Sequence, residues 1–199
     1  MKKLFLTLAL VLFAANANAV PTNDAVKYTF DKDHTNVIWF ADHFGYSHPF
    51  GYFKDIQGFY SINQKNPASS SVEATIKIDS LTTPVDKFTE HLKTKDFFDV
   101  ATYPEAKFVS TKVEVTGKNA ATVTGNLTLH GVTKPITMEV KLNSIGAHPF
   151  NKRDAAGFSA RAVFKRSDFG MTSFLPGVGD EVRIFIETEG YSQDDAAKK

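Results

Sequence analysis

Apolar and polar residues alternate along most of this chain, and this period of two constrains the fold more than any other feature. Successive side chains of a β-strand point to opposite faces, so an alternating segment predicts a strand with one apolar and one wet face. The pattern predicts eight main strands, with a short additional one over 26–30 as an alternative. The eight cover residues 35–44, 51–63, 72–78, 105–115, 121–129, 136–142, 158–164 and 182–186.

Turn sequences such as TGKN, HGVTKP and NKRDAAG separate several of these segments at hairpin distances, which indicates an antiparallel meander. Eight antiparallel strands form a sandwich or a closed barrel, and an eight-stranded barrel is either filled by side chains or holds one small ligand. Small residues at predicted inward positions favour a ligand, whereas Phe158 and Phe164 could fill the same space from across the barrel. The small residues are Gly58, Ala74, Gly125, Ala160 and Ala162.

One segment, residues 83–104, interrupts the strands. Thr83 as N-cap and Pro84 at the first helical position predict a short amphipathic helix of about ten residues. Asp96 is expected to cap a second, shorter helical turn that carries Phe97 and Phe98. We expect this insertion to plug one end of a barrel or to form the wall or lid of a ligand entrance.

The first 19 residues have the layout of a secretory signal, with two lysines, an apolar run and small residues before an A-x-A cleavage site. We expect cleavage after Ala19 and export of residues 20–199 as a single domain. No later segment approaches the roughly 20 apolar residues of a membrane helix. The exported protein is therefore expected to be soluble, without a membrane span.

Charge and cysteine content exclude several functions. Without Lys2 and Lys3 the 23 basic residues become 21 against 22 acidic ones, which predicts no binding of nucleic acid or anionic membrane. The chain has no cysteine, so disulfides, thiolate metal sites and cysteine nucleophiles are excluded. Phenylalanine, by contrast, occurs 18 times and needs a place in the fold.

Candidate catalytic and metal sites are weak. His43 and His48 with Asp42 could bind zinc or iron, but their spacing matches no established ligand pattern. Ser47 beside His48 lacks an orienting acid, and no G-x-S-x-G motif is present. We therefore expect no catalytic residue, no cofactor and no bound metal.

Five segments in order resemble the YceI-like family: DKDHTNVIWFADHF, IKIDSLTT, HLKTKDFFDVATYPEAKFVST, GNLTLHGVTKPITMEV and RSDFGM followed by VGDEVRI. The resemblance covers essentially the whole mature chain. It implies an all-β, lipocalin-like, eight-stranded antiparallel barrel in the periplasm. It further implies a pore that holds the tail of an amphiphile such as a polyisoprenoid, a quinone or a fatty acid amide. A homodimer is suggested by analogy with family members.

On this interpretation the protein carries or stores an amphiphilic lipid without catalysing a reaction, and its residues fall into three predicted groups. The channel is lined by Trp39, Ile76, Ile78, Phe108 and Phe164. A lid or mouth is formed by Phe44, Phe53, Phe88, Phe97, Phe98, Phe169, Met171 and Phe174. The candidates for contact with a polar head group are His43, His48 and Arg166.

Two alternatives remain at this point. The same barrel could be a lipid-modifying or metal-dependent enzyme that uses His43 and His48. It could also be a filled barrel that acts through its outer surface.

Overall fold

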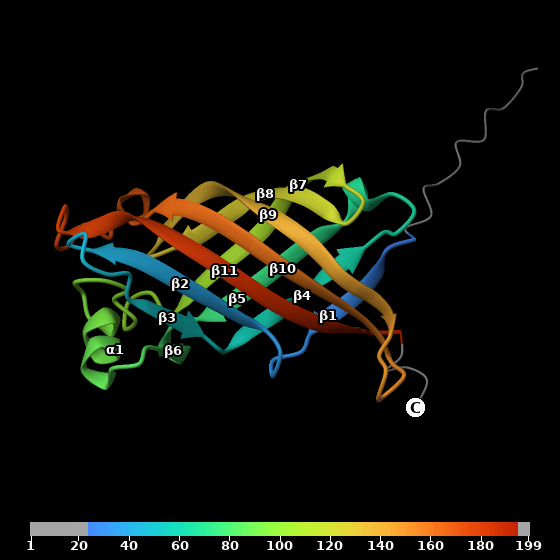
Figure 1. The fold of residues 1–199 in the computed structure, drawn as a ribbon, viewed down its shortest axis with the longest axis horizontal. Coiled ribbons are helices and arrows are strands. Elements are labelled where there is room, and N and C mark those ends of the chain that lie inside the picture. The colour runs from blue at the N-terminus through green and yellow to red at the C-terminus, as the bar shows by residue number, and fades with distance from the viewer. Residues whose placement is uncertain (1–23, 195–199) are drawn as a thin grey trace, which may run out of the picture.

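The alternating segments form antiparallel β-strands in the computed structural model, which describes residues 24–194 (Figure 1). The predicted signal segment and its cleavage after Ala19 lie outside the described residues. The strands are β1 (Val26–Phe30), β2 (Asn36–His43), β3 (Phe50–Phe53), β4 (Ile56–Ile62), β5 (Ser71–Lys77), β6 (Leu81–Thr82), β7 (Glu105–Gly117), β8 (Ala120–Leu129), β9 (Val132–Ala147), β10 (Asp154–Lys165) and β11 (Val178–Ser192). The helices are α1 (Asp86–Lys93) and the 3₁₀ turns η1 (Pro67–Ser69), η2 (Ile78–Ser80) and η3 (Arg166–Phe169).

The sheet closes on itself. Its order runs β1-β4-β5-β7-β8-β9-β10-β11, and β11 pairs back to β1, where Tyr28 lies opposite Ser192 and Phe30 opposite Gly190. A second row, β2-β3-β6, continues from β11. The prediction of a closed eight-stranded antiparallel barrel is confirmed.

The barrel has eight strand positions around its circumference. Each of the first three positions is occupied by two consecutive strands with a break between them, so eleven strands form the barrel. β1 and β2 share β11 as a neighbour, β3 and β4 are separated by Lys54 and Asp55, and η2 separates β5 from β6. The alternative of a short strand over 26–30 is confirmed. The continuous strand predicted over 51–63 is wrong, because it breaks into β3 and β4, and β6 was not predicted.

The inserted helix is present but begins later than predicted. Val85 occupies the N-cap position of α1 and no side chain caps it, so the prediction of Thr83 as N-cap is wrong. Thr83 is buried instead, and its hydroxyl lies 2.9 Å from the Thr89 hydroxyl on the first turns of the helix. Leu92 of α1 is buried and packs into the main hydrophobic core, which holds the helix at one end of the barrel (Figure 1).

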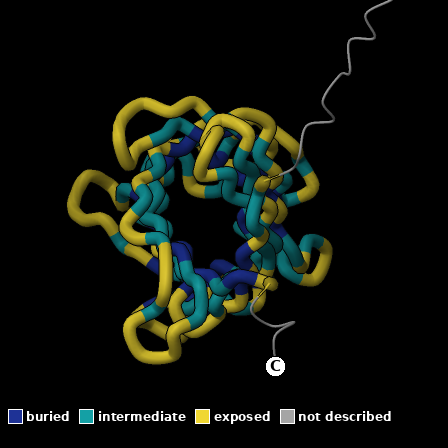
Figure 2. The backbone as a smooth tube through the Cα atoms, turned by 90° about the vertical axis from the view of Figure 1, so that its right-hand side faces the viewer, coloured by how far each residue is buried: buried dark blue, intermediate teal, exposed yellow. Residues whose placement is uncertain are grey.

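Viewed along the barrel, the strands form a ring with many buried and half-buried residues, while the connections that project from it are mostly exposed (Figure 2). Close packing of the wall depends on Gly125, because a Cβ there would lie 2.6 Å from the Val109 carbonyl oxygen and would also strike the ring of Phe108. The ring of Phe108 on β7 therefore occupies the space that a side chain at position 125 of β8 would take. No helix among the described residues is long and apolar enough to cross a membrane.

Candidate functional site

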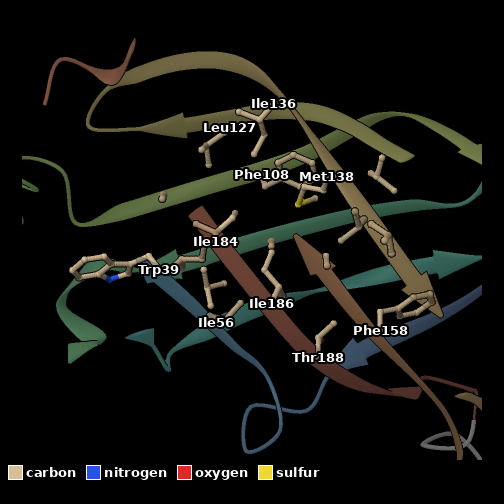
Figure 3. Close-up of a pocket in the computed structure, with 18 of the residues that line it drawn as sticks. Trp39, Ile56, Phe108, Leu127, Ile136, Met138, Phe158, Ile184, Ile186 and Thr188 are labelled. Atoms are coloured by element: carbon tan, nitrogen blue, oxygen red, sulfur yellow. The ribbon is translucent and has the colours of Figure 1, made fainter. Parts of the chain in front are cut away.

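A cavity of about 820 Å³ runs through the barrel, and strands from all around the ring contribute to its wall. The alternation predicted from sequence accounts for the lining: on β11 the wall is made by Val182, Ile184, Ile186 and Thr188 (Figure 3). From Val178 to Thr188 the lining follows ten residue steps of a tilted strand, or roughly 25 Å along the barrel axis. The cavity is elongated and apolar, and the alternative of a filled barrel is wrong.

Aromatic rings gather where the cavity meets α1. Phe97 stacks on Phe174 with ring centres 5.7 Å apart, and His91 packs edge-on against both rings. Phe44 comes from the β2–β3 loop, and its backbone N–H donates to the Gly177 carbonyl. Because Phe44 and Phe174 line the cavity and are 56% and 52% exposed, the cavity reaches the surface here. We call this the aromatic end.

Trp39 lies inside the aromatic end, with its ring 6.3 Å from that of Phe88 on α1. In Figure 3 it stands at one end of the cavity, and Phe158 and Thr188 stand toward the other. A side chain at Gly51 would strike the indole, so Gly51 makes room for it. The indole N–H is buried with no hydrogen-bond partner among the described residues.

The opposite end of the cavity is polar. Its lining comes from the β4–β5 connection and from the β7–β8 hairpin, and includes Asn63, Gln64, Ser71, Lys118 and Asn119. Gln64, Lys118 and Asn119 are exposed, so the cavity also reaches the surface here. We call this the polar end. Of the described residues that line the cavity, none is Asp or Glu.

Arg166 is buried beside the aromatic end, where each nitrogen of its guanidinium donates to a backbone carbonyl. Its Nε donates to the Gly179 carbonyl at 2.9 Å, Nη1 to Met171 at 2.8 Å and Nη2 to Val178 at 2.9 Å. Burial lowers its pKa, which the nearby carboxylate of Asp180 partly opposes. These bonds hold the segment after η3 against the start of β11.

The structure brings most predicted site residues to the cavity wall. All five channel residues line it, as do Phe44, Phe53, Phe88, Phe97, Phe98, Met171 and Phe174 of the lid group, and His43 and Arg166 of the head-group candidates. Phe169 does not: it is only 1% exposed and packs edge-on against Phe164, because η3 turns it into the core behind the wall. His48 lies outside, in a shallow outer pocket with Phe40 and Phe185.

His43 and His48 do not come together with Asp42 as three metal ligands. His48 Nε2 lies 3.9 Å from Asp42 Oδ1, whereas His43 packs edge-on against Phe44. Among the described residues, the group that could hold an ion is Asp31, His34 and Glu189, which lies at the β1–β2 connection outside the cavity wall. Among the described residues, the structure therefore does not gather His43, His48 and Asp42 into one group of metal ligands.

Comparison with known proteins follows from this fold. The family model of the YceI-like domain matches residues 28–190 of the chain. The chain belongs to the YceI-like family. Protein YceI of Salmonella arizonae is 39% identical over 189 residues, which cover 94% of this chain and 95% of that protein. The YceI-like resemblance seen in five sequence segments is thus confirmed over the described barrel.

Solved structures share the YceI-like barrel. BcnA of Burkholderia cenocepacia superposes with a TM-score of 0.73 and 26% identity, covering 80% of this chain and 98% of that one. A domain from Saccharophagus degradans, described as polyisoprenoid-binding, superposes with a TM-score of 0.64 and 14% identity, covering 84% of this chain and 99% of that one. At that identity the second likeness concerns the fold alone.

Sequence reasoning missed the polar end of the YceI-like cavity. Lys118 and Asn119 stand in the TGKN segment, which was interpreted only as a turn, and Gln64 stands in the connection after β4. The available signal was that each side chain follows a strand whose alternate residues point inward. The outcome depends on how the connections fold over the barrel end, which the strand period does not specify.

Proposed function

We propose that this protein binds an amphiphilic lipid and carries or stores it, with the hydrocarbon tail in the barrel cavity. The observation that most supports this proposal is the cavity itself, which is elongated, apolar and reaches the surface at both ends. A polyisoprenoid, quinone or fatty acid amide has the matching form, a long apolar tail with one polar end.

The energetics favour such a tail. Each buried methylene contributes about 0.8 kcal/mol, so a tail of about ten carbons supplies enough free energy for tight binding after ordering costs. The lining residues that would contact it are aliphatic and aromatic, including Ile76, Ile184 and Phe164. Little polar chemistry is required along the tail.

Membership of the YceI-like family supports this function, as does the likeness in fold to a domain described as polyisoprenoid-binding. In this account the protein is exported to the periplasm by residues 1–19, cleaved after Ala19, and acts without catalysis, as a monomer or a homodimer. His43 lines the cavity and His48 lies in an outer pocket, which gives no specific support to an enzyme that uses both.

Binding of farnesol to the purified chain, residues 20–199, tests the proposal. Native mass spectrometry after addition of farnesol from cyclodextrin is expected to show one molecule per chain. The same experiment with a short glycol of similar mass serves as the control and is expected to show none. A chain that takes up neither farnesol nor a long fatty amide contradicts the proposed function.

A further inference from the structure

The two ends of the cavity differ in chemistry, although both are built from exposed connections between strands. Connections are ordinarily polar because they meet water. The polar end follows this expectation, but the aromatic end does not, since Phe44 and Phe174 stand exposed at its opening. The cavity therefore has a direction that an amphiphile can recognise.

At the aromatic end two of the cavity-lining polar side chains, Arg166 and His91, already have polar partners. The guanidinium of Arg166 donates to three backbone carbonyls, and His91 Nε2 lies 3.2 Å from Asp96 Oδ2. His43 packs edge-on against Phe44, with ring centres 4.8 Å apart. The indole nitrogen of Trp39 is buried and has no hydrogen-bond partner among the described residues.

At the polar end the side chains are available. Within residues 24–194, no described hydrogen bond or ion pair engages the side chains of Gln64, Lys118 or Asn119. The three stand on two neighbouring connections, since β5 pairs with β7, which leads into the hairpin that carries Lys118 and Asn119. Together they present an ammonium and two amides, which donate to oxygen acceptors.

The charges along the wall favour one class of head group. The wall has Lys118 at the polar end and the engaged Arg166 at the other, and none of its described residues is a carboxylate. A cationic amphiphile would find no counter-charge in the cavity, and it would meet Lys118 at the polar end. A neutral oxygen-rich head or an anionic one, a phosphate or a carboxylate, meets complementary donors.

We infer that the amphiphile lies in one orientation, with a neutral or anionic head group at Gln64, Lys118 and Asn119 and the end of its tail beside Trp39. This inference rests on the proposed function and adds the class and direction of the ligand. It replaces the earlier expectation that the head group meets His43, His48 or Arg166.

The chain contains a reporter for this orientation, because Trp39 is its sole tryptophan. We would measure Trp39 fluorescence with two brominated stearic acids, one with bromine at the tail terminus and one with bromine next to the carboxylate. Bromine quenches a nearby indole, so the terminal bromine is expected to quench strongly and the carboxylate-side bromine weakly. The reverse order overturns the inferred orientation. Equal quenching by both also overturns it, because it means that the ligand binds in either direction.

A charge variant tests the head-group class. Lys118→Gln is expected to weaken binding of farnesyl phosphate by up to about fivefold, the range of an exposed ion pair, and to weaken farnesol binding less, because the glutamine amide still donates to a neutral hydroxyl. Lys134→Gln is the matched control, since Lys134 is an exposed lysine of β9 that does not line the cavity. Equal affinity of both variants for farnesyl phosphate overturns the role of Lys118.

The two proposals fail differently. If neither stearic acid nor farnesol binds, the proposed function is wrong, and the inferred orientation of the bound lipid falls with it. If both bind but dodecyl trimethylammonium binds as tightly as dodecyl phosphate, the function stands and the inferred head-group class is wrong.

Discussion

At the scale of single residues, Arg166 shows how a charge can be buried for structure rather than for a ligand. Its three bonds to carbonyls join the segment after η3 to β11, and Asp180 completes the arrangement by accepting from the backbone N–H and the hydroxyl of Ser167. Burial by itself would raise the pKa of Asp180. The two hydrogen bonds from Ser167 and the positive charges of Lys165 and Arg166 lower this pKa by more, so the net shift is downward.

We predict that Arg166→Met lowers the free energy of unfolding by about 3 kcal/mol, because it leaves buried carbonyls without donors. Urea unfolding followed by circular dichroism measures this. Arg161→Met on the exposed face of β10 is the control and should cost less than about 1 kcal/mol, since the described contact of the Arg161 guanidinium within residues 24–194 is a cation–π contact with Phe185. Equal losses in the two variants would contradict the structural role of Arg166.

Ala160 gives the residue-scale test of the cavity. It lines the wall from β10, where a larger side chain would project into the space proposed for the tail. Ala160→Phe should weaken binding of farnesol about tenfold, which corresponds to displacing roughly two methylenes, while thermal stability changes little. Val163→Phe, at a 55% exposed position of the same strand, should leave binding unchanged. Unaltered binding by Ala160→Phe would exclude the tail from this part of the cavity.

At the scale of elements, the connection between β1 and β2 is stabilised by charge. His34 Nδ1 donates to Asp31 Oδ2 at 2.7 Å, and this bond, with the charges of Asp31, Glu189 and Asp33, raises the pKa of His34 above its ordinary 6.5. For Asp31, partial burial raises the pKa, but the hydrogen bonds from His34 and from the backbone of Asp33 lower it by more, so the pKa of Asp31 lies below 3.8. Both groups are therefore charged between these values.

The sign of the pH dependence follows. Because its pKa is raised in the folded state, protonated His34 adds its full contribution to the free energy of unfolding below about pH 6.5. This contribution is lost as the pH rises through the folded-state pKa. Wild type should therefore lose more unfolding free energy between about pH 6 and 8 than His34→Gln, in urea titrations at several pH values. On the acid side the contribution of Asp31 is lost as the pH falls through its lowered pKa. Parallel pH profiles of wild type and His34→Gln would refute this coupling.

The elements also show what the sequence could predict. Alternation located the strands, because one face of each is apolar and packs inward. It did not locate the break at Lys54 and Asp55, because the prediction treated the segment as one alternating run, whereas the inward positions change from Phe53 in β3 to Ile56 in β4. The start of α1 was misplaced because Thr83 forms its bonds with Thr89 as a buried pair instead of capping the helix.

At the scale of the whole molecule, the sequence predicted a closed barrel but left open whether its interior was full. The free volume inside the barrel depends on which aromatic rings project toward the barrel axis. The ring of Phe108 lies at the wall, in the space that the missing side chain of Gly125 leaves. Phe169 was placed at the mouth by its position after β10, but η3 rotates it into the core. The two ends differ in chemistry because each is built from several loops that lie far apart in the sequence. No short segment of the sequence therefore shows this difference.

The most direct test of the account is mass spectrometry of an organic extract of the mature protein, purified without detergent from a bacterial periplasm. If the cavity holds a lipid tail, the extract should contain one prenyl or acyl amphiphile with a neutral or anionic head group, near one molecule per chain. Ala160→Phe purified in parallel should carry much less of it. An empty extract from wild-type protein that also refuses added farnesol would contradict the central claim that this cavity holds a lipid tail.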